Sequence, residues 1–219
     1  MMKNTLNLDD IRNILREISK LMDDNKDYLC KLDGAIGDGD IGLTMSKGFR
    51  AIIENLPNIP EENIGVVLMR SALVMGETVA STMGTLMASA LIRGGKVSQG
   101  KTEVNVEDLL VVTKAMVEGL MERGKAKLGD KTILDSFVPA VEAIEEAHKQ
   151  GKSMKEAIKC AYEAAEQGAK RTIEMQSRLG RAGRYLERSI GHQDPGATVG
   201  ALFFKGFSNY IDSICSSVA

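Results

Sequence analysis

Apolar residues recur at helical spacing along most of the chain, and no segment shows the alternation of apolar and polar residues that predicts a strand. The first such segment runs from Leu8 to about Tyr28, with Ile11, Ile14 and Ile18 on one face. Aromatic residues make up only 4% of the chain and Trp is absent, so residues that favour strands are scarce. The sequence therefore predicts an all-α fold.

Pairs of polar residues with the spacing of helix caps mark where several of the expected helices begin. These pairs are Asn7 with Asp10, Asn105 with Asp108, Thr132 with Asp135, and Ser153 with Glu156. We expect a non-helical loop at 33–42 and, beyond it, helices at 43–55, 63–93 (with a break near 81–84), 105–120, 132–150, 153–173 and 197–214, with the first turn of the third helix at Pro60.

One domain is expected for residues 1–219, because no internal repeat, low-complexity tract or linker separates two cores. The predicted architecture is a bundle whose glycine-rich loops gather at one end. With 28 Lys and Arg against 30 Asp and Glu, the net charge of −2 argues against nucleic acid or an anionic membrane as a partner. No apolar run has the length of a membrane span and no CxxC pair is present, so we expect a cytoplasmic protein with reduced thiols.

A phosphate-loop pattern, GxxxxGK[ST], is matched by residues 95–102. The pattern binds phosphate only where a buried strand leads into it and a helix starts at its Lys-Thr pair. Here the preceding residues have a helical pattern and the following ones, EVNVED, lead to a new helix cap. We therefore interpret the match as a loop between two helices and place a P-loop NTPase last among the possible functions.

Three carboxylates lie within eight residues at Asp33, Asp38 and Asp40, interleaved with glycines. Such a cluster of anions is stabilised by a cation, and a set of oxygen ligands without His or Cys favours Mg²⁺ or Ca²⁺. An EF-hand is excluded, because the twelfth position counted from Asp38 is Phe49 instead of Glu. The alternative is a solvated acidic turn, since turns favour Asp and Gly.

Two further clusters bear on this choice. The small and hydroxyl-bearing residues of TVASTMGT, at 78–85, are suited to contact phosphate oxygens, or alternatively to close packing between helices. The segment 181–196 carries Arg181, Arg184 and Arg188 and then a turn, Asp194 to Gly196, at the start of the last helix. Arginines near a magnesium loop suit a nucleotide polyphosphate, whereas alone they would be surface ion-pair partners.

The strings AIGDGDIGLTM, GDKTILD and SIGHQDPGA together resemble the L subunit of dihydroxyacetone kinase, the ADP-binding component of the phosphotransferase-dependent enzyme. The resemblance spans nearly the whole chain. It implies an eight-helix antiparallel barrel, with ADP or ATP and two Mg²⁺ ions bound by loops at one end. The implied activity is phosphoryl transfer, in which bound ADP is rephosphorylated and the phosphoryl group then passes to a short ketose.

The resemblance also assigns residues by position. It implies metal binding by Asp33, Asp38 and Asp40, which with Arg181 would form the catalytic set. The implied nucleotide contacts are Ile41, Gly42, Thr44, Thr82, Met83, Gly124, Ile133, Arg181, Asp194, Pro195 and Gly196. The chain departs from the family pattern at Ile41, at Thr44 and in the loop 80–84, where the family commonly has His, Asn and a GG-x-SG sequence. These departures leave the acceptor and the transfer rate open.

The implied partners are a ketose-binding subunit of the K type and a phosphocarrier subunit of the M type. A transcription regulator and a second copy of the chain are further expected partners. Two alternatives stay open at this point. One is an ATP-consuming variant that acts on another ketose or polyol, and the other is a non-catalytic Mg-nucleotide-binding regulator of a transcription factor.

Overall fold

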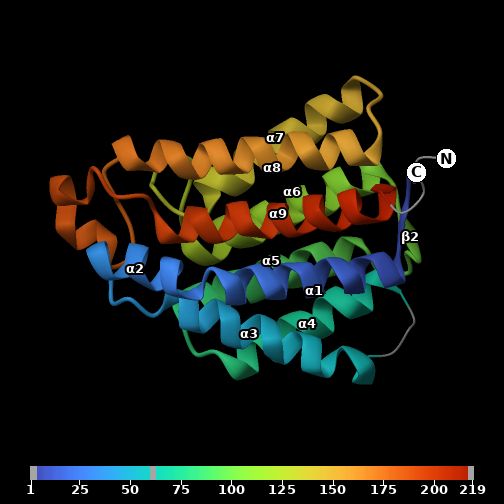
Figure 1. The fold of residues 1–219 in the computed structure, drawn as a ribbon, viewed down its shortest axis with the longest axis horizontal. Coiled ribbons are helices and arrows are strands. Elements are labelled where there is room, and N and C mark those ends of the chain that lie inside the picture. Colours follow the sequence, from blue (N-terminus) through green and yellow to red (C-terminus); the bar gives the residue numbers. More distant parts are fainter. Residues whose placement is uncertain (1–3, 60–62, 217–219) are drawn as a thin grey trace.

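The computed structural model describes residues 4–59 and 63–216, and almost all of its regular structure is helical (Figure 1). The α-helices are α1 (Leu8–Asp24), α2 (Lys26–Ile36), α3 (Ile41–Asn55), α4 (Ile64–Thr78), α5 (Thr82–Val97), α6 (Val106–Gly124), α7 (Leu134–Lys149), α8 (Met154–Arg171) and α9 (Pro195–Ser216). Three 3-10 helices are η1 (Leu56–Asn58), η2 (Thr172–Glu174) and η3 (Ala182–Ser189). Strands β1 (Leu6–Asn7) and β2 (Glu103–Val104) pair antiparallel. The all-α class is confirmed.

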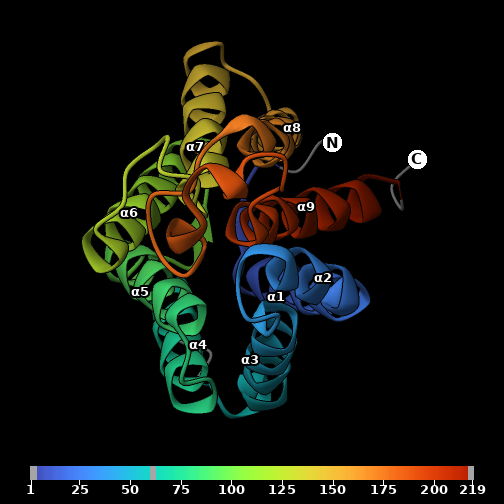
Figure 2. The same ribbon diagram turned by 90° about the vertical axis from the view of Figure 1, so that its left-hand side faces the viewer.

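Eight of the helices form a closed ring. Each packs on the next in the order α1, α3, α4, α5, α6, α7, α8, α9, and α9 packs back on α1. Figure 2 looks along this barrel, and Figure 1 shows that successive helices of the ring run in opposite directions along it. The N-termini of α3, α5, α7 and α9 therefore meet at one end, whereas the start of α1 and the end of α9 lie at the other. The eight-helix antiparallel barrel is confirmed, with α2 as an additional short helix beside α3 at its rim.

Three of the four cap pairs marked by the sequence form as predicted. Reciprocal side-chain-to-backbone hydrogen bonds join Asn7 with Asp10, Asn105 with Asp108, and Ser153 with Glu156 at the starts of α1, α6 and α8. The fourth pair differs. The Asp135 carboxylate accepts a hydrogen bond from the Thr132 N–H and the Thr132 hydroxyl accepts one from the Leu134 N–H, but α7 begins at Leu134, two residues later than predicted. Inside the ring, Phe137 packs against Phe203 and Phe204 between α7 and α9.

Two expected elements near the N-terminus are wrong. The first predicted helix is split at Asn25, whose side-chain amide donates to the Leu21 carbonyl and caps α1, as a side chain that competes with backbone hydrogen bonds does. The predicted loop 33–42 is shorter than expected, because Asp33 lies on the last turn of α2 and α3 already begins at Ile41. The expected helix start at Pro60 lies outside the described residues.

The segment 95–102, which matches the phosphate-loop pattern, begins in the last turn of α5 instead of after a strand, and it leads into β2. It lies at the end of the barrel opposite to α2, near the start of the chain (Figure 1). The interpretation as a helix-helix loop is confirmed.

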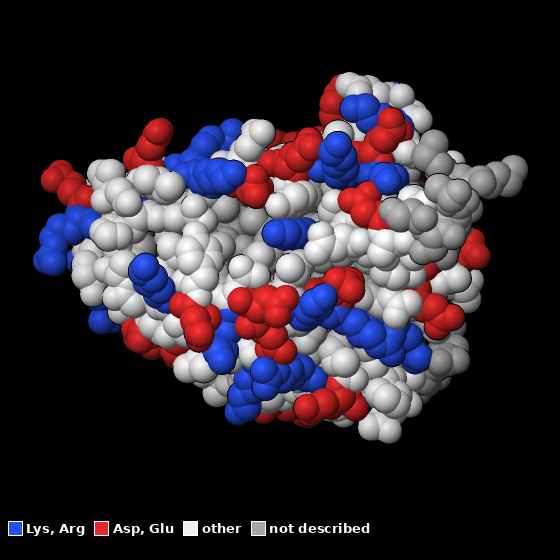
Figure 3. All heavy atoms as spheres, viewed as in Figure 1, with Lys and Arg blue, Asp and Glu red and all other residues white. Residues whose placement is uncertain are grey.

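Charged side chains of both signs are interspersed over the face shown in Figure 3. Among the residues the structure describes, no helix has the combined length and apolar character that crossing a bilayer requires.

Candidate functional site

A cleft of about 820 Å³ opens at the end of the barrel where the N-termini of α3, α5, α7 and α9 converge. This volume is in the range of small-molecule and cofactor sites. The first turns of these helices bring backbone N–H groups to the cleft, and such groups favour an anionic ligand. The lining comes from the connections before α3, α5, α7 and α9 and from the ends of neighbouring helices.

The three aspartates predicted to bind metal meet on one side of this cleft. Asp33 comes from the last turn of α2, and Asp38 and Asp40 from the connection to α3. One carboxylate oxygen from each residue lies within 4.8 Å of the others. Because they are half-buried or exposed and offer only oxygen, these groups fit a hard divalent cation such as Mg²⁺, which keeps several of its water ligands.

Local hydrogen bonds and glycines fix the shape of this acidic connection. The Asp33 carboxylate accepts hydrogen bonds from the backbone N–H groups of Asp40 at 2.9 Å and Ile41 at 3.2 Å, which ties the end of α2 to the start of α3. A Cβ atom at Gly37 would lie 2.3 Å from the other Asp33 carboxylate oxygen, and Gly39 has a φ of +78°. Both positions therefore require glycine for the carboxylates to converge.

Arg181 reaches the same cluster from the opposite side of the cleft. Its guanidinium forms an ion pair with the Asp38 carboxylate. It comes from the long connection between α8 and α9, at the start of η3. An arginine in this place can contact both the acidic cluster and the phosphate oxygens of a ligand, since its fork of N–H donors matches either group.

The start of α5 forms a second wall of the cleft. The Ser81 hydroxyl accepts a hydrogen bond from the Gly84 N–H and caps the helix, and Thr82 and Met83 line the cleft at its first turn. The helix dipole favours an anion at this position. A third wall is apolar: Leu86, Leu120 and Ile133 line it, and this part of the cleft suits a planar aromatic base.

Asp194 caps the start of α9 from a buried position. Its carboxylate accepts a hydrogen bond of 2.7 Å from the Ala197 N–H, and the residue is 6% exposed. Burial raises the pKa of Asp194 to about 7, and the negative charge of Asp135 acts in the same direction. The Ala197 N–H and the positive charge of Lys131 lower the pKa and offset part of this rise.

This raised pKa predicts a pH dependence of folding. The folded chain binds the Asp194 proton more tightly than the unfolded chain, whose pKa is near 3.8, so the stabilisation is full below pH 3.8 and is lost as the pH rises through about 7. We expect the free energy of unfolding of Asp194→Asn, relative to that of wild type, to rise by about 3 kcal/mol between pH 5 and pH 8. Urea unfolding at both pH values measures this. A difference that stays constant with pH would contradict the assignment.

The structure brings together all but one of the residues that the sequence assigns to the site. Those that line the cleft are Asp33, Asp38, Asp40, Ile41, Thr44, Thr82, Met83, Gly124, Ile133, Arg181, Asp194, Pro195 and Gly196. Gly42 is the exception, since it is not among the residues that line the cleft, and its nucleotide contact stays a prediction. It is buried against α2, where a Cβ atom would lie 2.0 Å from the Lys26 carbonyl oxygen, so Gly42 allows two helices to pack closely.

Sequence reasoning missed several lining residues. Leu86 and Leu120 lie within ordinary helical patterns, and nothing in the sequence separates them from core residues. Lys131 belongs to the GDKTILD string, yet a lysine in a polar loop is ordinarily solvated. In the structure it is only 2% exposed and lines the cleft.

Comparisons with known proteins place the chain among kinases. The family model described as the DAK2 domain matches residues 35–209. The ADP-binding subunit DhaL of PEP-dependent dihydroxyacetone kinase from Escherichia coli K12 is 38% identical over 188 residues, which cover 86% of this chain and 90% of that protein. The corresponding subunit of kinase 2 from Listeria innocua is 35% identical, over 84% of this chain and 86% of that protein.

A solved structure agrees with the sequence comparisons. The dihydroxyacetone kinase of C. freundii, in complex with AMP-PNP and Mg²⁺, superposes with a TM-score of 0.70 at 25% identity. The match covers 95% of this chain and 35% of that kinase, so this chain spans about a third of the larger enzyme. Because the family model matches residues 35–209, which include Asp38, Arg181 and Asp194, and relatives that cover most of the chain are more than 30% identical, the chain belongs to the DAK2 domain family.

Proposed function

We propose that this chain is the nucleotide-binding, phosphoryl-transferring subunit of a dihydroxyacetone kinase or of a kinase for a related short ketose. The observation that carries the proposal is the convergence of three carboxylates, Arg181 and the start of α5 on one cleft of about 820 Å³. Relatives that cover most of the chain are named ADP-binding subunits, which supports ADP or ATP as the ligand.

In this proposal the chain's residues position the phosphates and balance their charge. Asp33, Asp38 and Asp40 would hold two Mg²⁺ ions, which neutralise negative charge on β- and γ-phosphate oxygens. The Arg181 guanidinium lies beside Asp38 and stabilises the charge that spreads over the transferred group. The first turn of α5 offers backbone N–H groups to the phosphates, and the apolar wall at Leu86 and Leu120 holds the base.

The proposed cycle uses the nucleotide as a resident cofactor. A phosphocarrier subunit of the phosphotransferase system would convert bound ADP to ATP, and the γ-phosphoryl group would then pass to a ketose on a ketose-binding partner subunit. All three chains would work in the cytoplasm. A transcription regulator as a further partner, and the pairing of two copies of this chain, stay predictions.

Among the departures from the family pattern, Ile41 bears most directly on the rate of phosphoryl transfer. It follows the acidic cluster, lines the cleft and is 7% exposed, in the position where the family commonly has His. An isoleucine side chain has no donor or acceptor for a phosphate oxygen. In this proposal, transfer therefore depends on Arg181, the cations and the helix N-termini without help from that imidazole.

The proposal predicts that the purified chain retains its nucleotide. After gel filtration in buffer with Mg²⁺, the protein is denatured and the released nucleotide is identified by chromatography. We expect close to one ADP per chain, because a ligand enclosed by cations, an arginine and helix N-termini dissociates slowly.

The other outcomes separate the alternatives. Nucleotide that is lost on gel filtration but rebinds with Mg²⁺ would support the ATP-consuming variant. Retained ADP that is not phosphorylated when the phosphocarrier chain and its donor are added would support the regulator. A chain that neither holds nor binds Mg-ADP would refute both the kinase and the regulator.

A further inference from the structure

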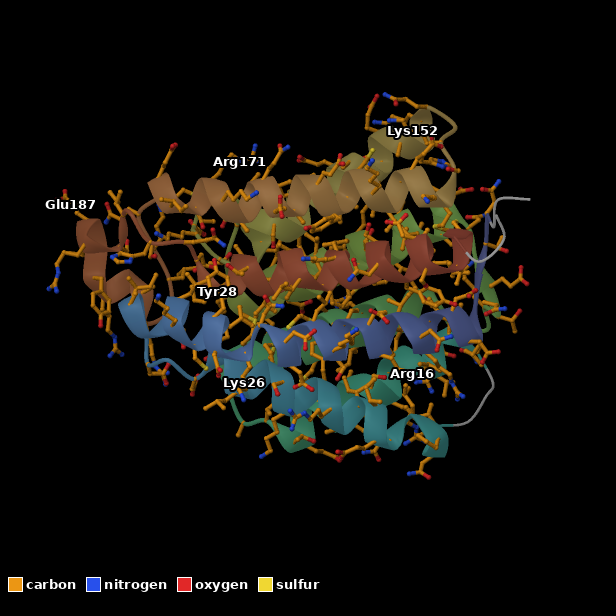
Figure 4. All side chains as sticks on the ribbon, in the orientation of Figure 1. Arg16, Lys26, Tyr28, Lys152, Arg171 and Glu187 are labelled. Atoms are coloured by element: carbon orange, nitrogen blue, oxygen red, sulfur yellow. The ribbon has the colours of Figure 1, made fainter. Side chains whose placement is uncertain are left out.

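A long connection between α8 and α9, which we call the strap (residues 172–194), lies over the nucleotide end of the barrel (Figure 2). It contains η2 and η3 and carries Arg181 at the start of η3. Glu187 lies at its outer tip, away from the barrel (Figure 4). The position of Arg181 therefore depends on what holds the strap in place.

One side chain from outside the strap joins its two limbs. The Lys131 ammonium donates one hydrogen bond to the Ser189 carbonyl at 2.5 Å and another to the Met175 carbonyl at 3.0 Å. Met175 belongs to the limb that leaves α8, and Ser189 belongs to the limb that returns to α9. The two residues are 14 positions apart, and Arg181 lies between them in the sequence. Lys131 comes from the loop before α7, so it links the limbs to each other and to the barrel.

Two features of Lys131 are unfavourable on their own. It is 2% exposed, and burial lowers the pKa of its ammonium, although the negative charge of Asp194 partly offsets this. Its backbone has a φ of +61°, in the left-handed region that non-glycine residues adopt infrequently. Strained backbone of this kind persists where the surrounding structure requires it, and it is concentrated at functional sites.

Two further hydrogen bonds join the limbs at the base of the strap, in addition to those from Lys131. The Ser177 N–H donates to the Ser189 hydroxyl at 2.8 Å, and the Gly191 N–H donates to the Ile173 carbonyl at 2.7 Å. Both bonds join the same two limbs. The strap is thus closed at its base, while Arg181 at its middle is exposed and paired with Asp38.

We propose that Lys131 is a positioning residue for Arg181. By holding the carbonyls of Met175 and Ser189 together, it closes the strap and sets the place from which Arg181 meets Asp38 and the phosphates. This inference rests on the proposed function, because it assigns Arg181 to the phosphate end of the nucleotide. It predicts that loss of the Lys131 charge affects recognition of the phosphates and leaves recognition of the adenosine part unchanged.

The test is a double-mutant cycle with two ligands. Dissociation constants for Mg-ADP and for adenosine are measured, by competition against a fluorescent nucleotide, for wild type, Lys131→Met, Arg181→Met and the double variant. We expect Lys131→Met to weaken Mg-ADP roughly tenfold or more, the loss expected for one charge-assisted hydrogen bond to phosphate. Adenosine should change less than twofold, and the double variant should bind Mg-ADP as Arg181→Met does.

Two further variants keep the test decisive. Lys127 is an exposed lysine of the same loop. Lys127→Met is therefore the matched control and should bind both ligands as wild type does. Ser189→Ala removes a second link between the limbs without removing a charge, and it should show a smaller loss confined to Mg-ADP. Ser189→Ala carries the test if Lys131→Met does not fold.

The outcomes separate this inference from the proposed function. Equal losses of adenosine and Mg-ADP, or losses from Lys131→Met and Arg181→Met that add, would overturn the inference and leave a purely structural lysine. An Arg181→Met variant that binds Mg-ADP normally would also overturn it. A wild-type chain that does not bind Mg-ADP would instead refute the proposed function itself.

Discussion

Replacing Asp38 with alanine is expected to weaken Mg-ADP binding by roughly 100-fold or more, beyond the ~10–100-fold that loss of an outer-shell partner costs a metal site. The change removes one of three converging carboxylates and the ion-pair partner of Arg181 together. Titration calorimetry of the nucleotide-free chain with Mg-ADP measures the loss.

Thermal unfolding distinguishes a cation site from a solvated acidic turn. Mg-ADP should raise the melting temperature of wild type and leave that of Asp38→Ala nearly unchanged, because only a ligand that binds the folded state stabilises it. Asp27→Ala is the matched control, since Asp27 lies on α2 with its side chain 97% exposed. Equal stabilisation of wild type and Asp38→Ala by Mg-ADP would identify the acidic connection as a turn.

Gly42→Ala is expected to lower both stability and Mg-ADP affinity, although Gly42 does not line the cleft. The added methyl group would lie 2.0 Å from the Lys26 carbonyl oxygen and 2.8 Å from the Cys30 sulfur, so α2 must move away from α3. Overpacking of this kind costs about 1–3 kcal/mol, or several degrees in melting temperature for a chain of this size. Asp33 moves with α2, so Mg-ADP binding should weaken roughly tenfold or more.

Gly34→Ala provides the comparison on the same helix. The nearest atom to a Cβ at Gly34 is 3.9 Å away, which is an ordinary contact, and alanine favours a helix more than glycine does. This variant should be at least as stable as wild type and bind Mg-ADP normally. If Gly42→Ala behaved in the same way, close packing would not explain the glycine. A variant as stable as wild type that lost affinity for Mg-ADP would instead support a direct phosphate contact at Gly42.

Features that depend on neighbouring residues could be predicted from the sequence. The cap pairs at Asn7, Asn105 and Ser153 form because each involves residues three positions apart. The break before Thr82 follows from a capping serine and small residues in the same stretch. The closure of the barrel depends on contacts between α1 and α9, which are distant in sequence, and only the family resemblance implied it.

The part of the site formed by neighbouring charged residues could be predicted from the sequence. The roles that depend on packing between distant segments could not. Three carboxylates interleaved with glycines predict a cation site, or alternatively an acidic turn, from neighbouring residues alone, and the carboxylates do converge. The roles of Gly42 and Lys131 depend on distant partners: Lys131 contacts carbonyls 44 and 58 positions further along the chain. No local pattern distinguishes such a lysine from a solvated one.

The even number of helices in the ring has a consequence for fusion proteins. The start of α1 and the end of α9 lie at the end of the barrel opposite to the cleft (Figure 1). A tag or immobilisation handle at either point would leave the cleft unobstructed. A partner fused there, however, must be tethered back along the barrel. The 22 residues of α9 give a length of about 33 Å, so roughly ten extended linker residues are the minimum reach for a single-chain enzyme.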